Sequence, residues 1–469
     1  MNSFNLCGRT RREFLNLAGN GFIGTAMTYM MASDGYLRAA SGVDQVPPLP
    51  AKAKACIFLF MVGGPSHVDT FDPKPTLKRL DGQKHEFPAS GSIVAKSGVL
   101  KGSPFHFTPR GQSGIEVSEL FPRLGACVDD MAIIRGTYAN SDSHSPATLQ
   151  MTTGAIRQGM PSIGSWIHYG LGTSNRNLPG FVVLLDASPL SGILNWSTSF
   201  LPPRFQGTVF AKGNCPVSNT RSASNFPEQE QRRQLDVLNS LNRSHLTSAP
   251  HSPELDARIA SYELAFAMQK KAPDAVDLSQ ESAETLSLYG IGSNSKITLP
   301  SDSFGRDCLT ARRLVERGVR FVQLFHGKHP GWDTHSDNDG GHRKMCGQTD
   351  QPIAGLLIDL KRRGLLDETL VVWAGEFGRT PFAEGSGRNH HPAGFTTWLA
   401  GGGIRGGVVH GATDEFGYAA VEGRTHIHDL HATILHQMGL DHERLTYRYN
   451  GRDFRLTDVE GHVIREIVA

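Results

Sequence analysis

Residues 54–62 read KACIFLFMV and run directly into Gly63-Gly64-Pro65. A continuous apolar run that ends in a glycine turn predicts a strand buried on both faces, as in a parallel sheet between two layers of helices. The same pattern predicts further strands over residues 131–135, 181–186, 319–325, 369–374 and 396–400. Helical periodicity falls between these runs, for example over residues 307–317 and 351–363. This alternation predicts a doubly wound α/β domain.

The composition narrows the classes of protein to consider. The 469 residues are 39% hydrophobic and 20% charged, with a net charge of +2. These values exclude a disordered chain, a collagen and a coiled coil. A chain so close to neutral has no electrostatic reason to seek nucleic acid, so we expect no nucleic-acid partner. Cys56 and Cys127 lie in apolar contexts that predict core positions, whereas Cys215 and Cys308 could pair.

The first 41 residues have the features of a twin-arginine export signal. Arg11 and Arg12 precede a modest apolar stretch, and Ala39-Ala40-Ser41 offers small residues for cleavage. The apolar stretch is too short and too rich in glycine to span a bilayer stably. We expect the twin-arginine export machinery to carry the chain to the periplasm or outside the cell, with no membrane span in the mature chain. The alternative is a buried amphipathic first helix.

The remaining residues, 42–469, are predicted to form the α/β domain, with an insertion at about 190–300. Residues 201–225 are rich in Pro, Ser, Asn and Gly, and residues 228–271 combine helical patterning with many charges. We expect a helical hairpin there, which either caps the site or packs beside it. A charged helical face is most often only a solvated surface.

Histidines and carboxylates follow several of the predicted strands. Ligands of open α/β sheets bind beyond the carboxyl ends of the strands, and 13 of the 20 histidines fall within residues 326–469. Imidazoles with carboxylates suit Zn²⁺, Mn²⁺ or Fe, whereas Ca²⁺ or Mg²⁺ is favoured where carboxylates dominate. The sequence therefore predicts a divalent metal ion, with zinc, calcium and manganese not distinguished, and the candidate ligands are His67, Asp69, Asp333, His335, Glu376, His390 and His391. The alternative is a network of polar residues that stabilises loops.

A predicted helix start supplies the candidate catalytic residues. Ser143-His144-Ser145-Pro146 follows the strand at 131–135, and helix N-termini attract anions. Ser143 or Ser145 could attack a phosphate or sulfate ester, and His144 could act as base, nucleophile or general acid. The alternative for this stretch is plain helix capping. Arg379 and Arg388 could clamp the ester oxygens, although Arg379 could equally be a structural partner of Glu376.

Five motifs together resemble one protein family. They are, in order, GGPSHVDTFDPKP (63–75), SHSPATLQMTTG (143–154), GWDTH (331–335), LVVWAGEFGRTP (370–381) and GRNHHP (387–392). Over residues 51–469 the chain resembles an exported, uncharacterised sulfatase-like family of unknown function in the alkaline phosphatase superfamily. The resemblance implies an alkaline phosphatase-like, three-layer α/β/α sandwich with a mostly parallel sheet and one or two metals. It also implies that the stretch 428–433, HDLHAT, is structural.

The departures from this family pattern shape the expected activity. Sulfatases of the superfamily carry Cys or Ser in a Cys/Ser-x-Pro-x-Arg string, and this residue is oxidised to formylglycine. Here His144 falls at that position and Thr148 falls where the Arg should be, and Glu376-Phe377 replaces an Asp-His metal pair. We expect a metal-dependent hydrolase of a phosphate or sulfate ester, such as a sulfated or phosphorylated polysaccharide, that works without formylglycine. The alternative is a non-catalytic, metal-stabilised scaffold or a carbohydrate-binding protein.

Overall fold

A computed structural model describes most of the chain after the leader. The described residues are 49–87, 97–173, 175, 177–186, 188–211, 227–248, 253–292, 300–327 and 331–469. They belong to one unit, residues Pro47–Ala469. The predicted signal peptide and Cys215 lie outside the described residues. Cys56, Cys127 and Cys308 are buried free thiols, so the two predicted core positions are confirmed.

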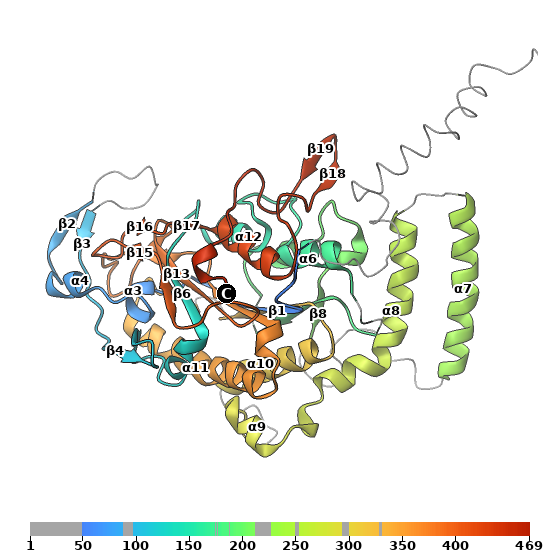
Figure 1. Ribbon diagram of the computed structural model, residues 1–469, viewed down its shortest axis with the longest axis horizontal. Helices are drawn as coiled ribbons and strands as arrows, with labels where there is room; N and C mark the ends of the chain where they lie inside the picture. The colour runs from blue at the N-terminus through green and yellow to red at the C-terminus, as the bar shows by residue number, and fades with distance from the viewer. Residues whose placement is uncertain are drawn as a thin grey trace, which may run out of the picture. The chain divides into compact units, whose positions relative to one another are not determined.

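The centre of the fold is a sheet whose pairings are mostly parallel (Figure 1). Its strand order is β14 (Val408–His410), β6 (Met131–Tyr138), β13 (Phe395–Ala400), β10 (Thr369–Ala374), β1 (Ala55–Met61), β9 (Phe321–His326), β7 (Phe181–Leu185) and β8 (Thr208–Phe210), with β17 (Thr425–His426) paired to β6. Only β13 runs antiparallel to its neighbours among these described strands. The carboxyl ends of β6, β10, β1, β9 and β7 therefore lie at one edge of the sheet.

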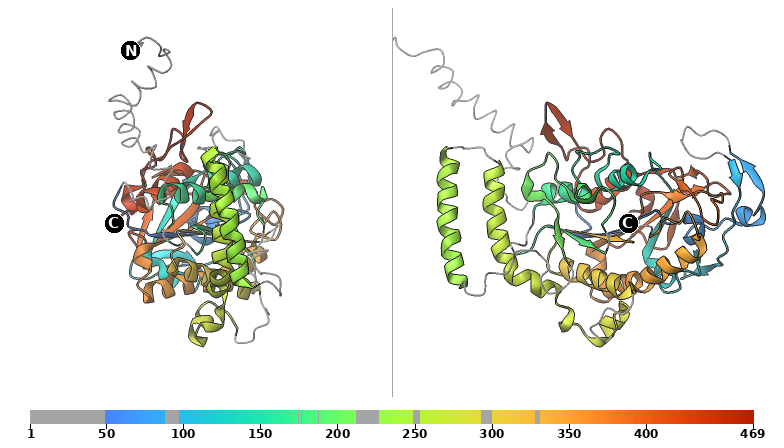
Figure 2. Two further views of the ribbon diagram at one scale, coloured as in Figure 1. Left: turned by 90° about the vertical axis from the view of Figure 1, so that its right-hand side faces the viewer. Right: turned by 180° about the vertical axis from the view of Figure 1, so that it is seen from behind.

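Helices cover both faces of the sheet, because successive residues of β1 point to opposite sides. Ile57, Leu59 and Met61 belong to a core shared with α10 (Pro300–Glu316) and α11 (Asn338–Arg362). The alternate residues, such as Phe58, belong to a second core with α6 (Ile163–Leu171) and α12 (Ile427–Gln437). Figures 1 and 2 show the two helix pairs on opposite sides of the sheet. The predicted three-layer α/β/α sandwich is confirmed.

Each of the six predicted strands is present, whereas the two predicted helices are longer than expected. α10 begins at Pro300 and α11 at Asn338. The first half of α11 buries polar side chains such as His342 and Thr349. A helix is recognised in a sequence by the spacing of its apolar residues, so buried polar residues make it harder to predict. Gly364, with φ +68°, follows the end of α11.

The segment at 190–300 contributes to the sheet and also forms a helical hairpin. β8 joins the edge of the sheet, and α7 (Glu228–Ser248) lies beside α8 (Pro253–Val276) in both figures. Arg232 and Glu263 link the two helices through a 2.7 Å hydrogen bond. α8 contacts α10, so the hairpin is attached to the helical layer.

Short elements fill the connections of the sandwich. They are α3 (His67–Thr70) and α4 (Pro75–Arg79) after β1, α5 (His144–Thr153) after β6, α9 (Ala283–Leu288), and the hairpins β2 (Lys84–Glu86) with β3 (Ser97–Val99), β4 (Phe107–Arg110) with β5 (Ile115–Ser118), β11 (Gly378–Arg379) with β12 (His390–His391), β15 (Ala412–Thr413) with β16 (Ala420–Glu422), and β18 (Tyr447–Tyr449) with β19 (Arg452–Phe454). Within the described ranges, no helix combines the length and the apolar character needed to cross a membrane.

Candidate metal centre

Five side chains from different connections meet beyond the carboxyl edge of the sheet. His144 is the first residue of α5, which follows β6; Asp333 and His335 follow β9; Glu376 follows β10; and His390 lies on β12. We call these five residues the His–Asp cluster. They gather because parallel strands deliver their following loops to the same edge, so residues more than 200 positions apart in sequence become neighbours.

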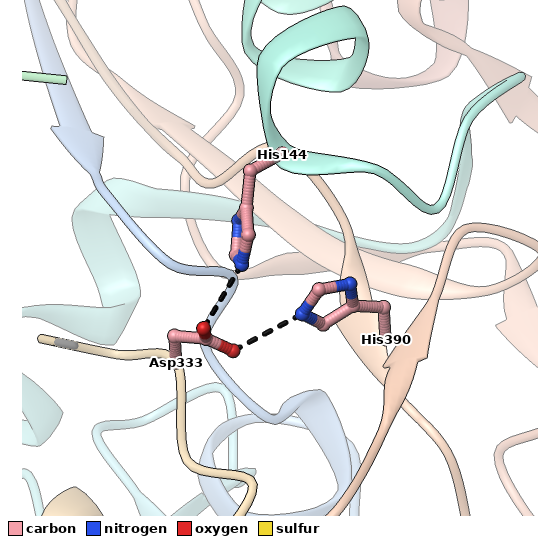
Figure 3. A group of neighbouring side chains, drawn as sticks. All are labelled: His144, Asp333 and His390. Carbon is pink, nitrogen blue, oxygen red and sulfur yellow. Dashed lines mark hydrogen bonds and ion pairs between the residues drawn. The ribbon is translucent and has the colours of Figure 1, made fainter. Parts of the chain in front are cut away.

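Asp333 is the centre of the cluster. Its Oδ2 lies 3.1 Å from Nε2 of His144, and its Oδ1 lies 3.1 Å from Nε2 of both His335 and His390. Figure 3 shows His144 and His390 approaching this carboxylate from different elements. Ligand atoms of these three residues lie within 4.8 Å of one another. Zinc bonds of about 2.0–2.1 Å place neighbouring tetrahedral ligands roughly 3.3 Å apart, so the observed spacing suits one shared cation.

The second nitrogen of each imidazole faces a hydrogen-bond acceptor. Nδ1 of His144 lies 2.7 Å from Oε1 of Glu376, Nδ1 of His390 lies 2.6 Å from the carbonyl oxygen of Asp142, and Nδ1 of His335 contacts Glu384. An acceptor at Nδ1 assigns the proton to that atom, which leaves Nε2 of the neutral ring with a lone pair. Such partners orient histidines that bind metals. The Nε2 atoms of three imidazoles therefore face one carboxylate, an arrangement that ring protons or a shared cation can stabilise.

The charges in the cluster perturb its pKa values strongly. Burial lowers the pKa of His144, but hydrogen bonds to Asp333 and Glu376 outweigh burial and raise it to about 9. Burial also raises the pKa of Asp333, yet the hydrogen bonds from His144 and His390 and the Arg379 charge hold it well below its usual range. Without another cation, a proton on His144 thus supplies the compensating charge. Perturbations of this kind concentrate at functional sites.

Arg379 fixes the loop that carries Asp333. Its side chain is completely buried; Nη2 donates to Oδ1 of Asp333 at 2.7 Å, Nε to the carbonyl of Gly64 at 2.9 Å and Nη1 to the carbonyl of Arg388 at 3.1 Å. Nη2 also contacts the carbonyl of Gly63. The guanidinium is thus engaged with Asp333 and with backbone carbonyls, rather than with Glu376 as one sequence alternative proposed.

The glycine turn after β1 forms the inner wall of the cluster. Gly63 has φ +116°, and a Cβ atom there would lie 2.5 Å from the backbone nitrogen of Asp333. Gly64 has φ +73°, and its Cβ would meet the ring of Phe377 at 2.6 Å. Both the backbone conformation and the space therefore require glycine at these positions. The N–H of Gly63 donates to Oε1 of Glu376 at 2.9 Å.

Asp69 and Arg388 lie outside the cluster and pair with each other. Both are completely buried, and Asp69 accepts from Nε of Arg388 at 2.8 Å, from Asn338 at 3.0 Å and from Ser66 at 2.6 Å. Burial raises the pKa of Asp69, but the Arg388 charge outweighs this effect and holds the pKa well below its usual range. The two residues form an internal ion pair rather than a ligand and an ester clamp.

His67 and His391 also lie apart from the cluster. Nε2 of His67 donates to the carbonyl of Gly417 at 2.8 Å, and Nε2 of His391 donates to the carbonyl of Tyr418. Burial lowers the pKa of both rings, to about 3 for His391. Adjacent residues of a strand point to opposite sides, so only His390 of the His390-His391 pair reaches the cluster.

The predicted helix start after β6 is confirmed. Ser143 is the N-cap of α5; its side chain is exposed and makes no capping hydrogen bond. Ser145 is half-buried, and its hydroxyl contacts that of Ser191. Ser143 therefore presents its hydroxyl to solvent directly beside His144.

A model of one protein family, described as "Protein of unknown function (DUF1501)", matches residues 53–468. The chain belongs to the DUF1501 family. This membership agrees with the resemblance drawn from the five motifs. A search of curated proteins gave no match for the DUF1501 chain.

Several solved structures are similar to the DUF1501 chain at low identity. The PsFucS1 sulfatase from Pseudoalteromonas sp. is 10% identical, with 92% of this chain and 72% of that chain covered and a TM-score of 0.34. A TAB5 alkaline phosphatase mutant with Mg bound in its M3 site is 12% identical, with 75% and 92% covered and a TM-score of 0.31. Ps i-CgsB in complex with k-i-k-neocarrahexaose is 10% identical, with 82% and 72% covered and a TM-score of 0.36.

Two partners of the cluster lie outside the five motifs of the DUF1501 sequence. Glu384, in the loop between β11 and β12, contacts His335, and the backbone carbonyl of Asp142 accepts from His390. A backbone carbonyl has no residue signature, so no motif could have identified the second contact. Glu384 lies between the LVVWAGEFGRTP and GRNHHP motifs, and this position was the one available hint.

Proposed function

We propose that this protein is an exported, metal-dependent hydrolase of phosphate or sulfate esters. The observation that carries the proposal is the convergence of Nε2 atoms from His144, His335 and His390 on the Asp333 carboxylate. The cluster adjoins the N-terminus of α5, where unpaired N–H groups and the helix dipole favour anions. A cation site beside an anion site is suited to an ester of phosphoric or sulfuric acid.

In this proposal His144, Asp333 and His390 hold the metal, with His335 at the exposed side, where its side chain is 40% exposed. Glu376 orients His144 and is not itself a ligand. The donor set is dominated by imidazole, which suits zinc better than calcium, whereas carboxylate sets suit calcium and manganese. When bound, a divalent cation supplies polarisation of ester oxygens and acidifies water to a pKa of about 7.

Residues around the metal site are assigned to the nucleophile, to positioning and to binding of the ester oxygens. Ser143 is the proposed nucleophile, since its exposed hydroxyl is not used for capping. His144 has both ring nitrogens engaged by carboxylates, so we assign it to metal binding rather than to attack. Arg379 and Arg388 are positioning residues, because their donors are used inside the protein. Backbone N–H groups at the start of α5 would hold the non-bridging oxygens.

A second candidate function is a metal-stabilised scaffold or a carbohydrate-binding protein. The observation in its favour is His144 itself, which stands where sulfatases carry the residue that becomes formylglycine and which here is committed to Asp333 and Glu376. Against this candidate, burying an ionisable group costs a few kcal/mol of folding free energy. A scaffold without a catalytic role would gain nothing from burying several of them.

A substrate panel tests the proposal. The protein, stripped of metal and reloaded with Zn²⁺, Mn²⁺ or Ca²⁺, is assayed on chromogenic phosphate monoesters, phosphate diesters and sulfate esters, and then on sulfated polysaccharide. We expect turnover of at least one ester class, with loss of about 100-fold or more in Ser143→Ala, whereas Ser240→Ala, at an exposed serine of α7, serves as the control. Silence across the panel together with retained polysaccharide binding would favour the second candidate.

We also propose that Arg11 and Arg12 direct export by the twin-arginine route, because the pair precedes a modest apolar stretch. The test is fractionation of cells that express the full chain or its Arg11→Lys, Arg12→Lys double variant. Retention of the variant inside the cytoplasm is expected. Equal export of the two forms would refute this route.

A further inference from the structure

A second group of metal-ligating side chains lies outside the His–Asp cluster. His426 is the N-cap of α12, His428 is in its first turn, and Glu460 lies on the C-terminal segment. Their ligand atoms lie within 4.8 Å of one another. Oε2 of Glu460 is 3.2 Å from Nδ1 of His428 and 3.5 Å from Nδ1 of His426. Both imidazoles are buried, whereas the Glu460 side chain is 61% exposed, so solvent reaches this group from one side.

The hydrogen bonds assign which ring nitrogens carry protons. Nε2 of His428 lies 2.6 Å from the carbonyl of Gly154, and Nε2 of His426 lies 2.9 Å from Oδ1 of Asn140, so both Nε2 atoms donate. Nδ1 of each neutral ring is then an acceptor. Nδ1 of His426 also accepts a long, 3.3 Å bond from the N–H of His428. The Nδ1 atoms of both rings thus face one carboxylate oxygen, and the Nδ1 of His426 also caps α12.

We propose that His426 Nδ1, His428 Nδ1 and the Glu460 carboxylate form a second divalent-cation site, with water as the remaining ligand. Two imidazoles and a carboxylate suit Zn²⁺ or a similar transition ion.

Other charges near the group are compatible with a cation. The Asp429 carboxylate, in the same helical turn, accepts from the backbone N–H groups of His426 and His462 at 2.7 Å each. This carboxylate offsets the positive end of the helix dipole, which would otherwise oppose a cation at a helix start. A cation near this group in the described part of the chain is Arg424, which lies over the ring of Tyr138, a neighbour of His426.

The site would brace the helix that carries His144. The ring nitrogens that do not face Glu460 hold Asn140, just before α5, and Gly154, its C-cap. A cation between the two rings would fix both contacts at once and attach the C-terminal segment through Glu460. None of its ligands belongs to the His–Asp cluster, so cation binding at this site can be measured separately from the proposed hydrolase activity.

The test uses the full exported chain in a His390→Ala background, which lacks a ligand of the first cluster. The protein is stripped of metal and titrated with Zn²⁺, and bound zinc per chain is measured by mass spectrometry. We expect one zinc per chain in His390→Ala and none after adding Glu460→Ala, whereas the exposed control Glu466→Ala keeps one. Zinc should raise the Tm of His390→Ala but not of the double variant.

The outcomes separate this site from the first one. Absence of zinc from His390→Ala, with two-state unfolding intact, would overturn the second site and leave the first untouched. Unchanged zinc affinity after Glu460→Ala would overturn it too. Two zinc ions per chain in the unsubstituted protein, falling to one in Glu460→Ala alone, would support both sites at once.

Discussion

Oε1 of Glu376 lies 2.7 Å from Nδ1 of His144, and this contact turns Nε2 of the same ring toward Asp333. The Glu376 side chain is completely buried, and the N–H of Gly63 fixes it from the other side. A buried carboxylate held in this way sets both the tautomer and the direction of the imidazole. Its contribution to the proposed metal binding is therefore indirect and can be measured separately.

Replacing Glu376 by Gln should weaken zinc binding by about 10–100-fold, the usual cost of removing an outer partner of a metal ligand. The reason is that an amide cannot hold the Nδ1 proton of His144 as firmly as a carboxylate. The measurement is competition with a chromogenic chelator. Glu368→Gln, on an exposed ion pair with Lys54, is the control. Equal affinity in Glu376→Gln and in the unsubstituted protein would disprove the orienting role.

The adjacent histidines of β12 offer a matched pair. His390→Ala should abolish zinc binding at the His–Asp cluster, because it removes a ligand atom. His391→Ala should keep the metal but lower the free energy of unfolding by about 1–3 kcal/mol, because it leaves the buried carbonyl of Tyr418 without its donor. Metal content and urea unfolding, measured for His390→Ala and His391→Ala, distinguish the two variants. Loss of metal in His391→Ala at unchanged stability would contradict the assignment.

Removing one partner of the buried Asp69–Arg388 pair should be costly. Asp69→Ala leaves the Arg388 charge buried and uncompensated, which typically costs about 3–5 kcal/mol of unfolding free energy. Glu368→Ala breaks an exposed pair and should cost less than about 1 kcal/mol. Urea denaturation followed by circular dichroism gives both values. A small effect of Asp69→Ala, similar to that of Glu368→Ala, would show that the pair is not buried as described.

The same pair predicts how stability depends on pH. The pKa of Asp69 is depressed in the folded protein relative to about 3.9 in the unfolded chain, so the unfolded state takes up its proton first as pH falls. Its contribution is complete above about pH 5 and is lost progressively at lower pH. Asp69→Asn should therefore show a flatter decline of unfolding free energy between about pH 5 and 2, measured in the presence of a chelator. If Asp69→Asn and the unsubstituted protein lose unfolding free energy equally over this pH range, the depressed pKa of Asp69 is contradicted.

Much of the fold could be predicted, because its strands are continuous apolar runs such as residues 54–62, whose pattern reports burial on both faces. Glu376 could be placed near His144 from the sequence because it closely follows the end of β10, although it was expected as a ligand and not as the partner of His144. The site was not predictable where the direction of one side chain decides the outcome, as for His67 and Asp69 in a single short helix. The proposed second cation site was not foreseen because Glu460 joins His426 and His428 only through the folded C-terminal segment.

The glycine turn at Gly63-Gly64 has a consequence for how such a site can diversify. A methyl group at either position would collide with the backbone at Asp333 or with the Phe377 ring, so substitution there should disturb the wall of the His–Asp cluster. Under the proposed function, changes in substrate preference are expected from substitutions on the solvent side, near the exposed Ser143. Randomising the solvent-exposed residues near Ser143 should change substrate selectivity, whereas randomising Gly63 and Gly64 should yield misfolded chains.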